Sequence, residues 1–197
     1  MKKLLLNSIF PTLLLLVTAC AQQATSIPTI SPTEIAKEEQ AVYASFFSNT
    51  SGIIVILQDT SIQWLPSSPE DVEQRMAYIA AGLPNASKET LANYLECNRQ
   101  SSQLSPDMQI GSDYILLGAD EFSAVMNQPN GWDAFYEKYS RSGYMQLSRV
   151  GFNQTLDQAI VYVASVPGPM MGAGNYYLME KKNGQWAIKE QVLAWVS

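Results

Sequence analysis

Three residues suited to chemistry are Tyr136, Tyr139 and Arg149. They lie close to the point where a sequence pattern typical of helices changes to the alternation of apolar and polar residues typical of strands. A guanidinium and two tyrosine hydroxyls that face one cavity can bind an anion, because all three groups donate hydrogen bonds. An arginine within a strand can equally pair with a carboxylate, since a buried unpaired charge is costly. We favour this structural ion pair and keep the anion-binding site as the alternative. The nearest carboxylates in the sequence are Asp120, Glu121 and Asp133.

Asp59 is a further candidate for a binding site. It follows the β-branched run from Ile53 to Leu57, which predicts a short strand buried on both faces. A polar residue just beyond such a strand can lie at the mouth of a cavity. We therefore count Asp59, together with Arg149, Tyr136 and Tyr139, among the candidate ligand-binding residues.

A glycine cluster at residues 168–174 separates two of the expected strands. It lacks the lysine and the Ser/Thr of a phosphate-binding loop, and it precedes a strand, not a helix. A tight or flexible turn is the simpler interpretation. The alternative is a mobile rim over a pocket, with Met170 and Met171 as adaptable apolar contacts.

The composition excludes several kinds of chemistry. The chain has no histidine, which excludes the Ser-His-Asp triad, histidine general acid–base catalysis and histidine zinc sites. Its two cysteines are Cys20 and Cys97, and we expect Cys97 to be a lone buried thiol. We therefore expect no metal site and no cofactor. The formal net charge of −6 argues against a nucleic-acid partner.

The first half of the sequence predicts helices with recognisable starts. Residues 31–34 form a capping box, in which Ser31 caps the helix and Pro32 takes its first position. A second capping box begins at Ser68, and Ser87 can cap a third helix. Short helical stretches follow around Phe122 and Trp132. The first helix carries an apolar stripe made of Ile35, Val42, Tyr43, Phe46 and Phe47.

The second half predicts strands, at residues 144–152, 159–165, 175–182 and 185–196, with a strand or extended segment earlier at 114–117. Asn183-Gly184 predicts a type I′ hairpin turn, since both of its central residues need positive φ. A change of phase predicts a β-bulge near Ser148-Arg149. This order predicts an α+β fold, with N-terminal helices packed on one face of a curved antiparallel sheet of about four to five strands.

The start of the chain resembles the signal of a bacterial lipoprotein. Lys2 and Lys3 form a basic head, residues 9–17 form an apolar segment, and two small residues precede Cys20. The resemblance implies that residues 1–19 are a signal peptide and that Cys20 is lipidated. Two or more acyl chains, such as palmitate, suffice for stable membrane anchoring. The alternative is an ordinary secretory signal followed by a chance cysteine.

This resemblance implies an exported protein that is attached to a bacterial membrane through Cys20. No aspartate follows the cysteine, which favours the outer membrane if the cell has one. The polar, uncharged segment 20–30 predicts a tether. We expect residues 31–197 to form a single α+β domain.

The last third of the chain resembles a family of bacterial proteins that have no assigned activity. The resemblance is carried by four segments: residues 131–139, 147–153, 158–163 and 177–188. The closing hairpin is also similar to the last strands of NTF2-like (SnoaL-like) domains. In an enzyme of that kind, an aspartate such as Asp59 can act as a base beside tyrosine donors.

Two functions follow as expectations. The first is a non-catalytic, lipid-anchored domain of the cell envelope that binds an envelope protein or a small apolar ligand. The second is a small NTF2-like isomerase or dehydratase that uses a carboxylate and tyrosines. A deep pocket that encloses a desolvated carboxylate beside a tyrosine would favour the enzyme.

Overall fold

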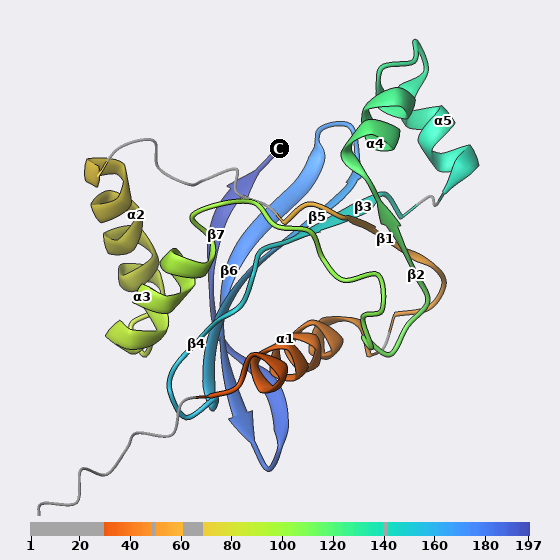
Figure 1. The fold of residues 1–197 in the computed structure, drawn as a ribbon. Helices are drawn as coiled ribbons and strands as arrows, with labels where there is room; N and C mark the ends of the chain where they lie inside the picture. Colours follow the sequence, from red (N-terminus) through yellow and green to blue (C-terminus); the bar gives the residue numbers. More distant parts are fainter. Residues whose placement is uncertain (1–29, 49, 61–68, 140–141) are drawn as a thin grey trace, which may run out of the picture.

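The computed structural model describes residues 30–48, 50–60, 69–139 and 142–197 (Figure 1). The elements in chain order are α1 (Pro32–Phe47), β1 (Ile54–Leu57), α2 (Pro69–Gly82), α3 (Lys88–Cys97), β2 (Tyr114–Leu117), α4 (Ala119–Met126), α5 (Gly131–Lys138), β3 (Tyr144–Leu147), β4 (Gly151–Phe152), β5 (Gln158–Gly168), β6 (Met171–Lys182) and β7 (Gln185–Val196). The predicted signal peptide, Cys20 and nearly all of the predicted tether lie outside the described residues. No helix in the described ranges is long and apolar enough to cross a membrane.

The described strands form one seven-stranded sheet in the order β2-β1-β3-β5-β6-β7, with β4 also paired to β5. Strands β3 to β7 pair antiparallel, whereas β1 is parallel to both β2 and β3. The α+β class is therefore confirmed, but the expectation of a smaller, antiparallel sheet is wrong. A crossover that contains α2 and α3 joins β1 to β2, and such a crossover returns the chain in the same direction.

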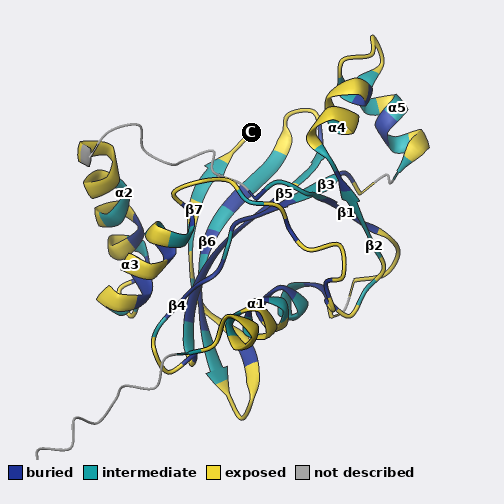
Figure 2. Cartoon of the chain, in the orientation of Figure 1, coloured by how far each residue is buried: buried dark blue, intermediate teal, exposed yellow. Residues whose placement is uncertain are grey.

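The helices cover both faces of the sheet, and not one face as the sequence pattern indicated. Val161 and Val163 of β5 pack in the same apolar cluster as the buried residues of α1. The alternate residues Ile160 and Tyr162 pack with α2 and α3, because successive side chains of a strand point to opposite faces. Val55 of β1 packs with α4 and α5. Figure 2 shows buried residues running along the strands between these layers.

Two of the three predicted helix caps are confirmed. The Ser31 hydroxyl accepts a hydrogen bond from the backbone N–H of Glu34 at 3.2 Å, and that of Ser87 accepts one from Thr90 at 3.0 Å. These bonds satisfy backbone donors that have no partner within the first turn of a helix. The other capping box begins at Ser68, which lies outside the described residues, and α2 begins directly after it at Pro69.

The strand irregularities lie close to where the sequence pattern changes. The irregularity expected near Ser148 is a break between β3 and β4, where the Ser148 hydroxyl accepts a hydrogen bond from the backbone N–H of Tyr162 at 2.8 Å. Asn183 and Gly184 have φ values of 53° and 81°, as the predicted hairpin requires. The glycine cluster forms a tight turn between β5 and β6, with Met170 at its tip.

Candidate functional site

Arg149 forms an ion pair, but its partner is none of the carboxylates nearest in the sequence. Its Nε lies 2.6 Å from Oε1 of Glu39, which belongs to α1. The same oxygen accepts a hydrogen bond from the backbone N–H of Val150 at 3.0 Å and lies 3.1 Å from the hydroxyl of Tyr43. The residue Glu39 is only 9% exposed. The Tyr43 hydroxyl also lies 2.8 Å from the Ser148 carbonyl, so Arg149 and the Val150 N–H are the two donors that serve this carboxylate throughout.

The Glu39–Arg149 contact favours the protonated forms of Arg149 and Tyr43. The hydrogen bond to Glu39 raises the pKa of Arg149 above its usual value. Burial, together with the negative charge of Glu39, raises the pKa of Tyr43 well above its usual value. Arg149 and Tyr43 therefore both remain protonated near neutral pH. This behaviour is typical of a structural ion pair and not of an acid–base catalyst.

Asn98, just after α3, holds the backbone of Arg149 in place. Its Oδ1 accepts a hydrogen bond from the backbone N–H of Arg149 at 2.9 Å, and its Nδ2 donates to the Arg149 carbonyl at 3.0 Å. The neighbouring Cys97 is the lone thiol of the described residues. Burial raises the pKa of Cys97 to about 12, so its thiol is poorly suited to nucleophilic attack at neutral pH.

Tyr136 lies on α5 and Tyr139 follows directly after it, and neither shares a hydrogen-bond partner with Arg149. The Tyr136 hydroxyl donates to the carbonyl of Pro167 at 2.7 Å. The Tyr139 hydroxyl donates to Oε1 of Glu121 at 2.7 Å, and the Nζ of Lys138 lies 2.8 Å from the same oxygen. The tyrosines therefore tie the α5 region to α4 and to the end of β5, and their hydrogen bonds do not bring them together with Arg149 as the alternative of an anion-binding site requires.

Asp59 lies in the lining of a pocket of about 590 Å³, which we call the Asp59 pocket. Its lining includes Leu57, Asp59, Thr60, Leu117, Phe122 and Gln146. The volume is in the range of pockets that hold small ligands, and the lining combines apolar walls with a few polar groups. None of the other three candidate residues lines it.

The Asp59 pocket lies at the carboxyl ends of the parallel strands. β1 and β2 end together, since Leu57 is paired with Leu117. On the other side of β1, Met145 of β3 is paired with Ile56, so Gln146 comes one residue further toward the same end. Ligands commonly bind at the carboxyl ends of parallel strands, because the chain leaves the sheet there and leaves room between the connections.

Hydrogen bonds to the segment 101–104 hold the pocket rim in place. The backbone N–H of Thr60 donates to the Ser102 carbonyl at 2.8 Å, and the Thr60 hydroxyl accepts from the backbone N–H of Ser102 at 2.9 Å. The backbone N–H of Leu104 donates to the carbonyl of Gln58 at 2.9 Å. Asp59 lies between these bonds, so its backbone is fixed from both sides.

Gln146 carries a buried acceptor that no described residue satisfies. The residue is 9% exposed, and its side-chain Oε1 is buried without a hydrogen-bond partner. An unsatisfied buried polar atom costs about 1–3 kcal/mol, so such atoms are rare in folded proteins. Gln146 also lines the pocket, so a rotation of its side chain would let a ligand donate a hydrogen bond to this oxygen and remove that cost.

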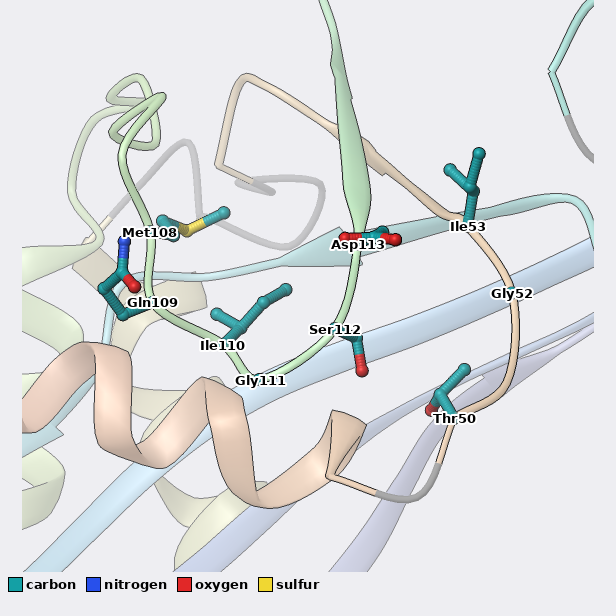
Figure 3. Close-up of a pocket in the computed structure, with 9 residues that line it drawn as sticks. All are labelled: Thr50, Gly52, Ile53, Met108, Gln109, Ile110, Gly111, Ser112 and Asp113. Carbon is teal, nitrogen blue, oxygen red and sulfur yellow. The ribbon is translucent and has the colours of Figure 1, made fainter.

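Two other hollows lie near the opposite ends of the same strands. One has a volume of about 480 Å³ and is bordered by residues 108–113 on one side and by Thr50, Gly52 and Ile53 on the other (Figure 3). A smaller one, of about 340 Å³, lies between the end of α1 and the sheet. Among the described residues that line them, neither hollow has a candidate residue or a buried polar atom without a partner. The Asp59 pocket is therefore the better-supported candidate site.

Sequence reasoning missed Glu39 and Gln146. Glu39 lies four residues from both Ile35 and Tyr43, on the apolar stripe of α1, and a charged residue at such a position was the available sign of a buried ion pair. Gln146 alternates with Met145 within β3 and carries no comparable sign, because a polar residue on every second strand position is ordinary.

Comparison of this chain with protein-family models, with curated proteins and with solved structures finds no match. The interpretation of the site therefore depends on its geometry and on the sequence.

Proposed function

We propose that this protein is an exported, lipid-anchored domain of the bacterial cell envelope that binds a small ligand in the Asp59 pocket. The ligand is mainly apolar and carries at least one hydrogen-bond donor. The observation that supports this most directly is Gln146, which lines a pocket of about 590 Å³ and whose buried Oε1 has no hydrogen-bond partner among the described residues. A rotation of the Gln146 side chain would let a donor on the ligand complete a hydrogen bond that the described residues leave unmade.

The apolar part of the ligand has a matching wall. Leu57 and Leu117 end the paired strands, and Phe122 follows on the first turns of α4. Contact with these side chains would remove apolar surface from water, which stabilises a complex by roughly 25 cal/mol for each Å² buried. The polar groups would set the ligand's orientation, as they do in most small-molecule sites.

Binding can be tested on the full chain with a mixture of small apolar compounds that carry N–H or O–H donors. We expect saturation-transfer NMR to identify binders, and their affinity for a Gln146→Met variant to fall about tenfold or more. Met keeps the length of the side chain and removes the acceptor. Gln128→Met is the matched control, since Gln128 is exposed, comes after the C-terminal end of α4 and is not among the residues that line the pocket. Equal affinities of wild type and Gln146→Met would contradict the proposal.

Attachment to the membrane is a separate part of the proposal and rests on the sequence of residues 1–20. Mass spectrometry of the N-terminal peptide from the native host should find residues 1–19 removed and acyl chains on Cys20. A Cys20→Ser variant should lose the acyl chains and leave the membrane fraction. Full-length protein with an uncut leader in the cytoplasmic fraction would contradict this part.

The alternative of an NTF2-like isomerase or dehydratase has less support. No tyrosine lies among the described residues that line the Asp59 pocket. The buried carboxylate that does contact a tyrosine, Glu39, is already bonded to Arg149 and lines none of the three pockets. An NTF2-like fold remains part of the proposal, supported by the long strands β5 to β7 that curve around α1 (Figure 1).

A further inference from the structure

Two hydrogen-bond acceptors of the pocket lining, Asp59 and Gln146, lie on the same face of the sheet. Val55 and Leu57 point to the face opposite α1, and the alternation continues to Asp59 through the bridge that pairs it with Gln103. Gln146 lies on the same face, since Met145 packs against the α1 side. A carboxylate side chain and an amide side chain therefore line one cavity from two neighbouring segments.

The charge around this cavity is negative. No lysine or arginine lies among the described residues that line it, and Asp59 forms no ion pair with a described residue. The first turn of α4 borders the pocket, but Asp120 and Glu121 in that turn already offset its partial positive charge. A carboxylate that borders a partly apolar pocket favours a cation as its counter-charge.

We infer that the ligand of the Asp59 pocket is an organic ammonium ion with an apolar body; this inference rests on the proposed binding function. The ammonium group donates hydrogen bonds to the Asp59 carboxylate and to Oε1 of Gln146. The apolar body packs on Leu57, Leu117 and Phe122. An ammonium ion has three donors and no acceptor, which suits a pair of acceptors.

Three probes of similar size test the inference: 2-phenylethylamine, 2-phenylethanol and phenylacetate. Titration calorimetry on the full chain should find that the amine binds about tenfold or more tightly than the alcohol, and that the acid binds most weakly. An Asp59→Asn variant should lose this preference, so that amine and alcohol bind within about twofold of each other. Asp107→Asn, at an exposed loop position, should retain the wild-type preference.

The outcomes separate the two proposals. Tighter binding of the alcohol or the acid, with an affinity that falls in Gln146→Met, would overturn the ammonium inference and leave the binding pocket standing. An amine preference that survives in Asp59→Asn would also overturn it, because the carboxylate would then not be the recognising group. Failure of all three probes, together with no Gln146-dependent binder in the wider mixture, would overturn both.

Discussion

Nε of Arg149 lies 2.6 Å from Oε1 of Glu39, and this contact joins α1 to the break between β3 and β4 across 110 residues of sequence. The Glu39 side chain is 11% exposed, whereas that of Arg149 is 35% exposed. The carboxylate is thus the more buried partner, and it also accepts a hydrogen bond from Val150. Its loss leaves several donors without an acceptor.

We predict that Glu39→Ala lowers the free energy of unfolding by about 3 kcal/mol, as expected for the removal of one partner from a buried pair. Arg149→Met should have a smaller effect, because Glu39 retains other donors. Urea denaturation measures both changes. The control is Glu121→Ala, which removes an exposed ion pair with Lys138 and should change stability by no more than about 1 kcal/mol. Equal effects of Glu39→Ala and Glu121→Ala would refute a structural role for the buried pair.

Glu38 gives a prediction about pH. Burial tends to raise its pKa, but hydrogen bonds from Lys181 at 2.6 Å and from Trp186 at 2.8 Å outweigh this effect and lower the pKa below its usual value of 4.5. A carboxyl whose pKa is lowered by folding stabilises the folded state above its unfolded pKa, and this contribution is lost as the pH falls through the folded value.

The free energy of unfolding should therefore fall more steeply in the wild type than in Glu38→Gln as the pH is lowered from about 5 to about 3. Urea denaturation at a series of pH values measures the difference. Glu73→Gln, at an exposed position on α2, serves as the control and should follow the wild-type curve. A Glu38→Gln curve parallel to that of the wild type throughout this range would exclude the predicted linkage.

We predict that a substitution at Gln146 stabilises the protein, whereas most substitutions of buried residues destabilise it. Replacing it by Met removes the unpartnered Oε1 and retains the side-chain length, so the ligand-free protein should gain about 1 kcal/mol in stability. The same variant should bind small apolar donors more weakly. Thermal unfolding without ligand measures the first effect, with Gln128→Met as the control. A marked loss of stability would show that the amide already has a structural role.

Gly151 tests the close approach of α3 to β4. A methyl group at this position would lie 2.2 Å from Cα of Tyr94, which is backbone and cannot rotate away. Gly151→Ala should therefore destabilise the protein by about 3 kcal/mol. Gly184→Ala is the comparison. Gly184 has a φ of 81°, but no neighbouring group lies within 4 Å of the position that an added methyl would take, so the expected loss of stability is about 1–2 kcal/mol. A smaller loss at Gly151 than at Gly184 in urea denaturation would mean that α3 moves aside.

The features that the sequence predicted correctly depend on residues close together in the chain. Ser31 caps a helix three residues from its donor, and Asn183-Gly184 determines a turn within a single hairpin. The pairing of β1 with β2 and β3 depends on how a long crossover packs. The run at 53–57 predicted a buried strand but contained no information on its neighbours or on their direction.

The candidate site shows the same division. Asp59 follows a predicted strand, so its place at the strand end could be anticipated, whereas its meeting with Gln146 needed the strand order of the folded sheet. Arg149 was expected to have a carboxylate partner near in sequence, but α1 supplies Glu39 instead. Side-chain type limits which contacts a residue can make, and only the topology decides which partner is within reach.

The hydrogen bonds between Thr60 and Ser102 also bear on how fast a ligand can enter and leave. Because folding already orders this rim, association requires little further loss of conformational entropy. Encounter rates should then be similar for different ligands, and differences in affinity should arise mainly from residence time. A pre-ordered rim of this kind would therefore select among ligands through their dissociation rates.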